Sequence, residues 1–162
     1  MVQVWAFIES ERAIIIVPET HFAKELIVGL NPLPMYIKLK NGGKSTATID
    51  VLRALITHKL PLVPVYFGIP NFTIAPIVPN DTSERILNFE TGWGQDTNEG
   101  VKSGHLQLFI YGVVEYRDEF SRRLSWFLGA RKTGFCFIYK PTGGVREPIF
   151  ETCKESAYTY TH

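Results

Sequence analysis

The chain has 162 residues, enough for one domain with a substantial core, and 45% of them are apolar. Its 17 basic and 16 acidic side chains leave a net charge of +1, which offers no electrostatic footprint for a nucleic acid polymer. No apolar run reaches the ~20 residues of a transmembrane helix, and the first residues lack the positive region of a signal peptide. We therefore expect a single globular domain over residues 1–162.

The first part of the chain is rich in β-branched and aromatic residues, which favour strands. Val2–Ile8 and Arg12–Val17 are predicted as two strands, or as one strand bent at Glu9-Ser10-Glu11. Pro18 is expected to end this run. Met35–Lys40 then alternates apolar and polar side chains, which is typical of a half-buried strand.

Asn41-Gly42-Gly43 is a turn signal, because Asn and Gly reach positive φ at little cost, so Asn41 and Gly43 are expected to shape a turn. Thr46–His58 fits either a strand or a helix, and we favour the strand because strand-like runs flank it on both sides. Five prolines in Pro61–Pro79 place that segment at a sheet edge or in extended connections, since proline cannot donate to a ladder.

The clearest strand pattern lies in Gly104–Phe120, after a short predicted strand at Glu84–Phe89 and a predicted surface loop at Thr91–Gly104. Its apolar side has period two and consists of Leu106, Leu108, Ile110, Val114 and Tyr116, whereas Gln107, Glu115 and Arg117 fall on the other side. Gly112 interrupts the pattern where a bulge or a close backbone neighbour would sit. The carboxylate of Asp118 can accept backbone N–H bonds in the turn that follows.

Gly134–Lys140 is predicted as a strong strand, which a turn at Thr142–Val145 returns into Pro148–Thr152. The terminal Tyr158–His162 alternates but is expected to fray unless it is paired. Many short strands separated by turns predict an all-β fold. We expect an immunoglobulin-like antiparallel β-sandwich, with a small antiparallel β-barrel as the alternative.

The only two cysteines, Cys136 and Cys153, flank this predicted hairpin. If Gly143–Arg146 forms a four-residue loop, Thr142 faces Glu147 and Cys136 lies directly across from Cys153, close enough for a disulfide. A slip of register by one residue removes that pairing. The alternative is a pair of reduced thiols in the core of a cytosolic protein.

The sequence contains no pattern of residues that indicates catalysis or metal binding. Its four histidines are scattered, and none has a partner at metal-ligand spacing. No nucleophile elbow, zinc-protease helix or complete phosphate loop is present. We therefore expect no cofactor, no metal and no enzymatic activity.

One group of aromatic and basic side chains could bind a ligand, because nucleobases stack on aromatic rings and phosphates pair with arginine. Its members are Tyr111, Tyr116, Arg117, Arg122 and Arg123. The alternatives are that the aromatic residues fill the core and that the arginines belong to a charged turn. Phe109 and Tyr111 fall opposite the main apolar set, so they are either covered by another element or exposed as a contact patch.

Three segments resemble the motifs of a known family. Leu39–Ala47 resembles I-x-N-x-G-x-T-P-A, with Leu39 in place of Ile and Ser-Thr in place of Thr-Pro. Tyr111–Phe120 resembles Y-G-x-I-x-Y-x-D-x-F, and Phe135–Tyr139 with Cys153 downstream resembles F-C-x-x-Y…C. Together they are similar to the soluble C-terminal β-sandwich domain of uncharacterised bacterial membrane proteins, in which one or two N-terminal transmembrane helices precede the domain.

An aromatic-rich fold without a catalytic constellation leads us to expect a non-enzymatic interaction or sensing domain. The resemblance implies that this domain is held at a membrane through a segment absent from this chain. It assigns no activity and no catalytic residue. The alternative is a receptor domain for a small ligand such as a nucleotide signal. The partner is then an unidentified protein or small molecule, the cytoplasmic side is favoured, and the oligomeric state stays open.

Overall fold

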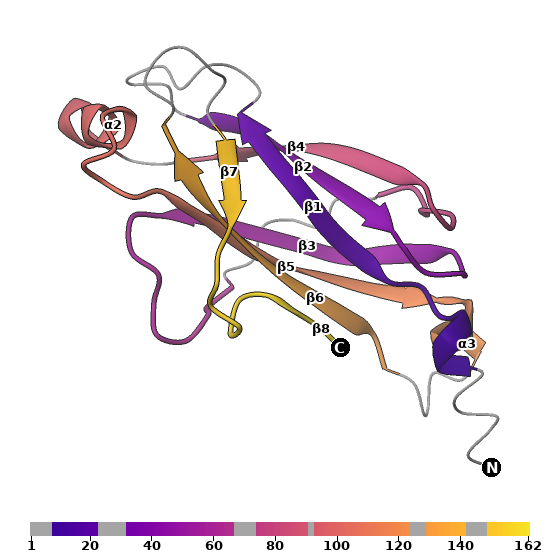
Figure 1. The fold of residues 1–162 in the computed structure, drawn as a ribbon. Coiled ribbons are helices and arrows are strands. Elements are labelled where there is room, and N and C mark those ends of the chain that lie inside the picture. The colour runs from indigo at the N-terminus through magenta and orange to yellow at the C-terminus, as the bar shows by residue number, and fades with distance from the viewer. Residues whose placement is uncertain (1–7, 23–31, 67–73, 91–92, 124–128, 142–148) are drawn as a thin grey trace.

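The chain folds into two antiparallel sheets that lie one over the other (Figure 1). The computed structural model describes residues 8–22, 32–66, 74–90, 93–123, 129–141 and 149–162. The first sheet has the order β1-β2-β4 and consists of β1 (Ile15–Phe22), β2 (Leu33–Asn41) and β4 (Thr82–Phe89). The second is built on β3 (Ala47–Thr57), β5 (Phe109–Asp118) and β6 (Arg131–Lys140).

Two short strands share the outer edge of β6, one after the other. They are β7 (Ile149–Thr152), paired with the second half of β6, and β8 (Tyr160–Thr161), paired with Thr133 and Gly134. The terminal strand predicted to fray without a partner is therefore paired. In the part of the chain that the structure describes, the helices are α2 (Gln95–Lys102) and α3 (Glu119–Arg123), and residues 8–11 form a further helical turn.

The strand order is that of an immunoglobulin-like sandwich. In that fold the A, B, E and D strands form one sheet and the C, F and G strands form the other. Here β1, β2 and β4 occupy the A, B and E places, and β3, β5 and β6 occupy the C, F and G places. The predicted all-β sandwich is confirmed, and the barrel alternative is wrong, because within the described residues the two sheets stay separate.

Alternating burial explains why these segments pair as they do. Along β2, buried residues alternate with half-buried or exposed ones, as predicted for Met35–Lys40. The strand choice for Thr46–His58 is confirmed by β3. Between the sheets lies one core of aliphatic and aromatic side chains. Its largest fully buried members are Tyr116, Ile15, Leu33, Met35, Ile37, Leu39, Ile77, Leu87, Leu108 and Ile110.

The first strand differs from its prediction at both ends. Ile8 is helical instead of extended, and the rest of Val2–Ile8 lies outside the described residues. Pro18 does not end β1: the strand continues to Phe22, and its register shifts by one residue between Ile16 and Glu19. Because β1 is an edge strand with an irregularity at this place, the missing N–H of proline removes no ladder bond that the sheet needs.

The predicted loop at Thr91–Gly104 is wrong, because it contains helix α2. Val101 anchors the helix with a fully buried side chain, and Asn98 is also buried. The helix ends where Gly104 adopts a positive φ of 78° and donates its N–H to the carbonyl of Val101. A polar sequence with one buried apolar residue carries too weak a pattern to predict a helix.

Gly112 lies inside β5, where the two neighbouring strands approach too closely to leave room for a side chain. A Cβ at this position would lie 2.2 Å from the carbonyl oxygen of Arg53 on β3 and 2.5 Å from the ring of Phe135 on β6. The pairing of β5 with β3 and with β6 is continuous through Gly112. The sequence left open a bulge or a close backbone neighbour at this position, and the structure has the close neighbour. Gly112 is thus a packing position within a strand and not a turn residue.

We expect Gly112→Ala to lower the free energy of unfolding by about 1–3 kcal/mol, because the central strands must move apart to admit the methyl group. Gly129→Ala is the matched control, since no atom of the described residues lies within 4 Å of the Cβ position there. Urea denaturation monitored by tryptophan fluorescence measures both. Equal midpoints for the two variants would contradict the packing role of Gly112.

Candidate functional site

The residues proposed from sequence as a ligand site do not come together. Tyr111 and Tyr116 lie on opposite faces of β5. Tyr116 is 0% exposed inside the sandwich, and its hydroxyl has no hydrogen-bond partner among the described residues. Tyr111 faces outward into a second, smaller cluster. One ligand therefore cannot contact both rings in this structure.

The arginines of that set are paired with carboxylates at the surface. Arg117 makes a two-pronged contact with Asp50, with Nε–Oδ2 and Nη2–Oδ1 distances of 2.7 and 2.8 Å. This hydrogen bond and the charge of Asp50 raise the pKa of Arg117. Arg123 pairs with Glu119 one turn earlier in α3, and the side chain of Arg122 lies outside the described residues. These ion pairs fit the alternative in which the arginines belong to a charged turn better than they fit a phosphate-binding site.

The hollows in the described part of the chain are open and shallow. One of about 560 Å³ is lined by Thr46, Thr48, Pro76, Glu119 and Arg123. Another of about 400 Å³ lies between β1 and the strand pair β6 and β8, and its polar lining is mostly threonine. Of the four proposed ligand residues whose side chains the structure describes, only Arg123 lines either of them.

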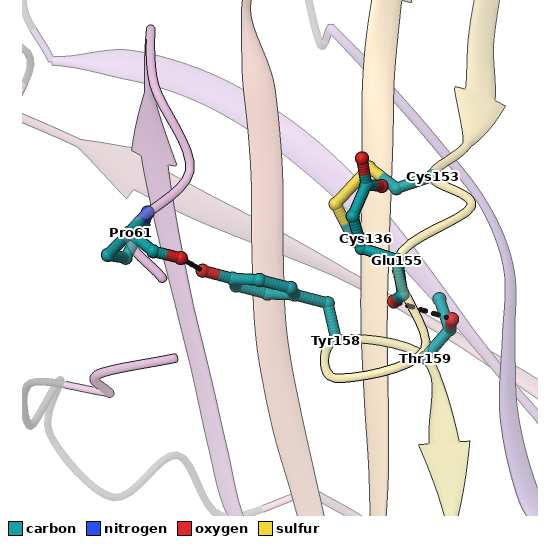
Figure 2. Close-up of a disulfide and its surroundings, with 6 residues drawn as sticks. All are labelled: Pro61, Cys136, Cys153, Glu155, Tyr158 and Thr159. Atoms are coloured by element: carbon teal, nitrogen blue, oxygen red, sulfur yellow. Dashed lines mark hydrogen bonds between the residues drawn. A yellow bond between two sulfur atoms is a disulfide. The ribbon is translucent and has the colours of Figure 1, made fainter. Parts of the chain in front are cut away.

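The outer face of the five-stranded sheet carries a cluster of tyrosines around the two cysteines. Cys136 and Cys153 are joined by a disulfide, and the β6–β7 register places them opposite each other as the hairpin count predicts (Figure 2). Tyr111 and Tyr158 complete the buried part of this cluster. Burial raises the pKa of both phenols. The sequence left open whether Tyr111 is covered by another element or exposed, and the structure shows that it is covered.

The segment Pro61–Val65 runs over this cluster and exposes aliphatic side chains. Leu62 is 99% exposed and Val63 70% exposed, the two largest values among the exposed large hydrophobic residues. The phenol of Tyr158 donates to the carbonyl of Pro61, and that of Tyr111 donates to the carbonyl of Val65 at 3.3 Å. We call Leu62, Val63 and Val65 the apolar tip. It is held at both ends by tyrosine hydroxyls.

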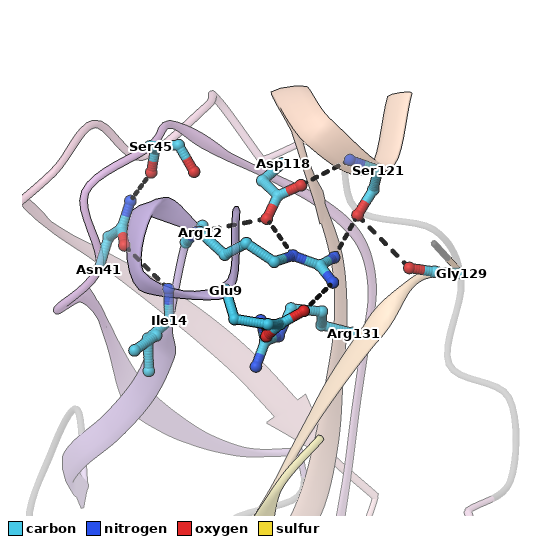
Figure 3. Close-up of polar contacts among 10 residues, drawn as sticks. Glu9, Arg12, Ile14, Asn41, Ser45, Asp118, Ser121, Gly129 and Arg131 are labelled. Atoms are coloured by element: carbon cyan, nitrogen blue, oxygen red, sulfur yellow. Dashed lines mark hydrogen bonds and ion pairs between the residues drawn. The ribbon is translucent and has the colours of Figure 1, made fainter. Parts of the chain in front are cut away.

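A buried ion pair lies at one end of the sandwich (Figure 3). The Nε of Arg12 donates to Oδ2 of Asp118 at 2.9 Å, and both side chains are almost fully buried. Asp118 also accepts the N–H of Ser121 at 2.7 Å, which caps the start of α3. Burial alone would raise the pKa of Asp118, but the hydrogen bonds from Arg12 and Ser121 outweigh it and lower this pKa.

This ion pair joins three parts of the chain. Glu9 from the helical turn at 8–11 contacts both Arg12 and Arg131, at 3.2 and 3.1 Å. The N–H of Ala13 also donates to Asp118. The carboxylate predicted to accept backbone N–H bonds therefore does so, from Ser121 and Ala13. The partner that the sequence pattern did not indicate is Arg12, 106 residues earlier.

Asn41 organises the turn between β2 and β3. Its Oδ1 accepts the N–H groups of Ile14 and Gly43, and its Nδ2 donates to the carbonyls of Ser45 and Ile77. Gly43 does not have a positive φ, so the expectation that it shapes the turn by adopting a positive φ is wrong. A Cβ on Gly43 would instead lie 2.3 Å from the carbonyl oxygen of Arg12.

We expect Asn41→Ala to destabilise the domain by about 3 kcal/mol or more. The substitution removes the side-chain partner of the Ile14 and Gly43 N–H groups and of the Ser45 carbonyl, whereas the carbonyl of Ile77 keeps the N–H of Ala47. Each buried polar group left unsatisfied costs about 1–3 kcal/mol. Asn88→Ala, at an exposed position on β4, is the control. The measurement is the urea midpoint at constant m-value. A loss no larger than that of Asn88→Ala would show that solvent replaces these bonds.

The described residues contain no group of three or more His, Cys, Asp and Glu side chains arranged to hold a metal ion. Among the same residues, no helix has the length and apolar character needed to cross a membrane. Comparison with known proteins gives no match among protein-family models, curated proteins or solved structures. The apolar tip on its tyrosine base, which the sequence did not single out, is the best candidate for a functional surface.

Proposed function

We propose that this chain is a non-enzymatic interaction domain that contacts its partner through the apolar tip. The observation that carries the proposal is the exposure of Leu62 and Val63, at 99% and 70%, on a segment that two tyrosine hydroxyls hold. Contiguous exposed apolar side chains are unfavourable in water and mark contact surfaces in soluble proteins. Membrane attachment through a segment outside this chain remains part of the proposal, on the motif resemblance alone.

The way the tip is held supports a role in recognition. The side chains of Leu60 and Tyr66, at either end of the segment, pack against the tyrosine and cysteine cluster. Pro61 and Pro64 restrict the backbone between them, so little conformational entropy is left to lose when a partner binds. A rigid, preorganised apolar surface binds more tightly than a mobile one of equal area.

The disulfide supports an oxidising compartment for this domain. Disulfides persist in secreted, periplasmic and extracellular proteins and are rare in the cytosol, where thiols are kept reduced. We therefore propose the non-cytoplasmic side of the membrane, in place of the cytoplasmic side that the sequence favoured. Quantifying free thiols by alkylation and mass spectrometry, in protein taken directly from its native cell, tests this. A fully reduced Cys136 would contradict it.

Site-specific photo-crosslinking tests the interaction function. A benzoyl-phenylalanine at position 62 is expected to form a discrete crosslinked product in native membranes. The same probe at Ile86, a half-exposed apolar residue on β4, is the control. The product should disappear when Val63→Glu is added, because a charge at the tip opposes apolar contact. Equal crosslinking from positions 62 and 86 would overturn the assignment of the tip.

The receptor alternative is less well supported, since the tyrosines and arginines proposed for it lie apart. A thermal-shift screen with nucleotides and cyclic dinucleotides separates the two functions. A ligand at about a hundred times its Kd adds about 2.7 kcal/mol of stability. A shift that Arg117→Ala abolishes would favour the receptor over the interaction domain.

A further inference from the structure

The C-terminal tail, residues 153–162, is attached to β6 at two places. At the first, Cys153 is bonded to Cys136 through the disulfide and donates its N–H to the carbonyl of Cys136 at 2.9 Å. At the second, β8 pairs through only two residues, and His162 exchanges two backbone hydrogen bonds with Lys132. The disulfide cross-links the tail directly to β6.

Between these attachments the tail places one side chain in the interior. Residues 154–157 are exposed, whereas Tyr158 is 2% exposed. Its ring meets that of Tyr111 edge-on, with centroids 5.1 Å apart and planes at 87°. Its hydroxyl reaches across to the carbonyl of Pro61 (Figure 2). Tyr158 thus connects the tail with the start of the segment that carries the apolar tip.

We propose that the Cys136–Cys153 disulfide is a redox latch that controls how firmly the Pro61–Val65 segment is held. With the disulfide closed, Tyr158 is fixed against Tyr111 and holds Pro61. With it open, the tail is left with the four-residue β7 before it and the two-residue β8 at the chain end, where short strands fray. Tyr158 then leaves, and of the two tyrosine hydroxyl bonds to the segment only that from Tyr111 to Val65 remains.

The reductant of this step is a dithiol. One of its thiolates attacks the sulfur of Cys153, which is slightly exposed, whereas Cys136 is fully buried. The S–S bond breaks, Cys136 leaves as a thiolate and takes up a proton, and a mixed disulfide forms on Cys153. The second thiol of the reductant then displaces Cys153, so the dithiol ends as a cyclic disulfide and the protein holds two thiols.

The consequence for binding rests on the proposed interaction function, but the latch itself is tested without a partner. Amide hydrogen exchange is followed by NMR in the oxidised protein and after addition of dithiothreitol. The amides of Cys153 and Tyr158 report the latch, because both donate backbone bonds within the tail or to β6. The amides of Ala47 and Ile77, which bond to each other's carbonyls, report the rest of the fold.

We expect reduction to speed exchange at Cys153 and Tyr158 at least about tenfold more than at Ala47 and Ile77, because the tail then opens locally in addition to any loss of stability of the whole domain. Unchanged exchange at Cys153 and Tyr158 would overturn the latch. Equal acceleration of all four amides would also overturn it, because reduction would then lower only the stability of the whole domain and would not open the tail separately.

Limited proteolysis measures directly how firmly the Pro61–Val65 segment is held. Thermolysin cleaves before Leu and Val, so cuts next to residues 62, 63 and 65 measure how firmly the segment is held. We expect faster cleavage there in Cys136→Ala/Cys153→Ala and in Tyr158→Phe, which loses only the hydroxyl that holds Pro61. Wild-type cleavage rates in both variants would overturn the latch. Crosslinking from position 62 is a separate measurement, so failure of the latch and failure of the interaction function are told apart.

Discussion

Asp118→Ala is expected to cost about 3–5 kcal/mol of unfolding free energy, which is a large part of the stability of a domain of this size. The substitution leaves the guanidinium of Arg12 buried without its carboxylate, and breaking one partner of a buried ion pair is far more costly than losing a surface pair. It also removes the acceptor that caps α3 through Ser121. Urea denaturation with constant m-value measures the loss.

Replacing both partners at once separates the cost of an unpaired buried charge from the loss of the pair itself. Replacing both members, as Arg12→Met/Asp118→Leu, removes both charges and leaves apolar side chains of similar reach. We expect the double variant to be more stable than Asp118→Ala, because no charge is left buried. The exposed pair Arg117–Asp50 is the matched control, and Asp50→Ala is expected to cost about 0–1 kcal/mol. A cost for Asp118→Ala as small as that of Asp50→Ala would contradict the structural role of the buried pair.

The same pair predicts how stability depends on pH. Asp118 has a lowered pKa in the folded protein, so the folded state binds fewer protons than the unfolded state near the ordinary carboxyl pKa of about 3.9. Its contribution is therefore complete above that value and is lost as the pH falls through the lower, folded pKa. We expect the slope of stability against pH below about pH 4 to be smaller in Arg12→Met/Asp118→Leu. An unchanged slope would contradict this assignment.

The sequence predicted the parts of the fold that depend on local alternation. β2, β3 and β4 follow period-two patterns, and the Cys136–Cys153 register follows from counting back along a hairpin. Helix α2 was missed because its one buried apolar residue, Val101, makes no periodic stripe. Pro18 was misjudged because its effect depends on which strand lies at the sheet edge, and that is set by residues far away in the chain.

The candidate site could not be predicted for a similar reason. Its elements come from three distant segments: Pro61–Val65, Tyr111 on β5 and Tyr158 in the tail. No spacing along the chain relates a phenol to a carbonyl 97 residues earlier. The proline-rich composition did indicate extended connections in this region, but not which of its side chains stay exposed. The grouping of Tyr111 and Tyr116 was unsuitable for one ligand because the two rings fall on opposite faces of the strand.

The disulfide gives the second large effect. Cys136→Ala/Cys153→Ala is expected to lower the unfolding free energy by about 3 kcal/mol, since the two cysteines are 17 residues apart and a cross-link of that span restricts the unfolded chain by about this amount. The two alanines keep the buried site apolar, so the comparison isolates the cross-link better than a single Cys→Ser change, which would leave a free thiol beside a hydroxyl. The measurement is the urea midpoint of the variant against the oxidised wild type.

The reduced wild type is the control for this second effect, because it keeps both sulfur atoms and lacks only the bond. We expect its midpoint to match that of the double alanine variant, with both below the oxidised protein. If reduction leaves the midpoint unchanged while the alanine variant loses stability, the effect comes from the packing of Tyr111 and Tyr158 against the sulfurs and not from the cross-link. The size of the loss also sets a limit on the latch, since a domain that unfolds on reduction cannot use the disulfide to control one segment.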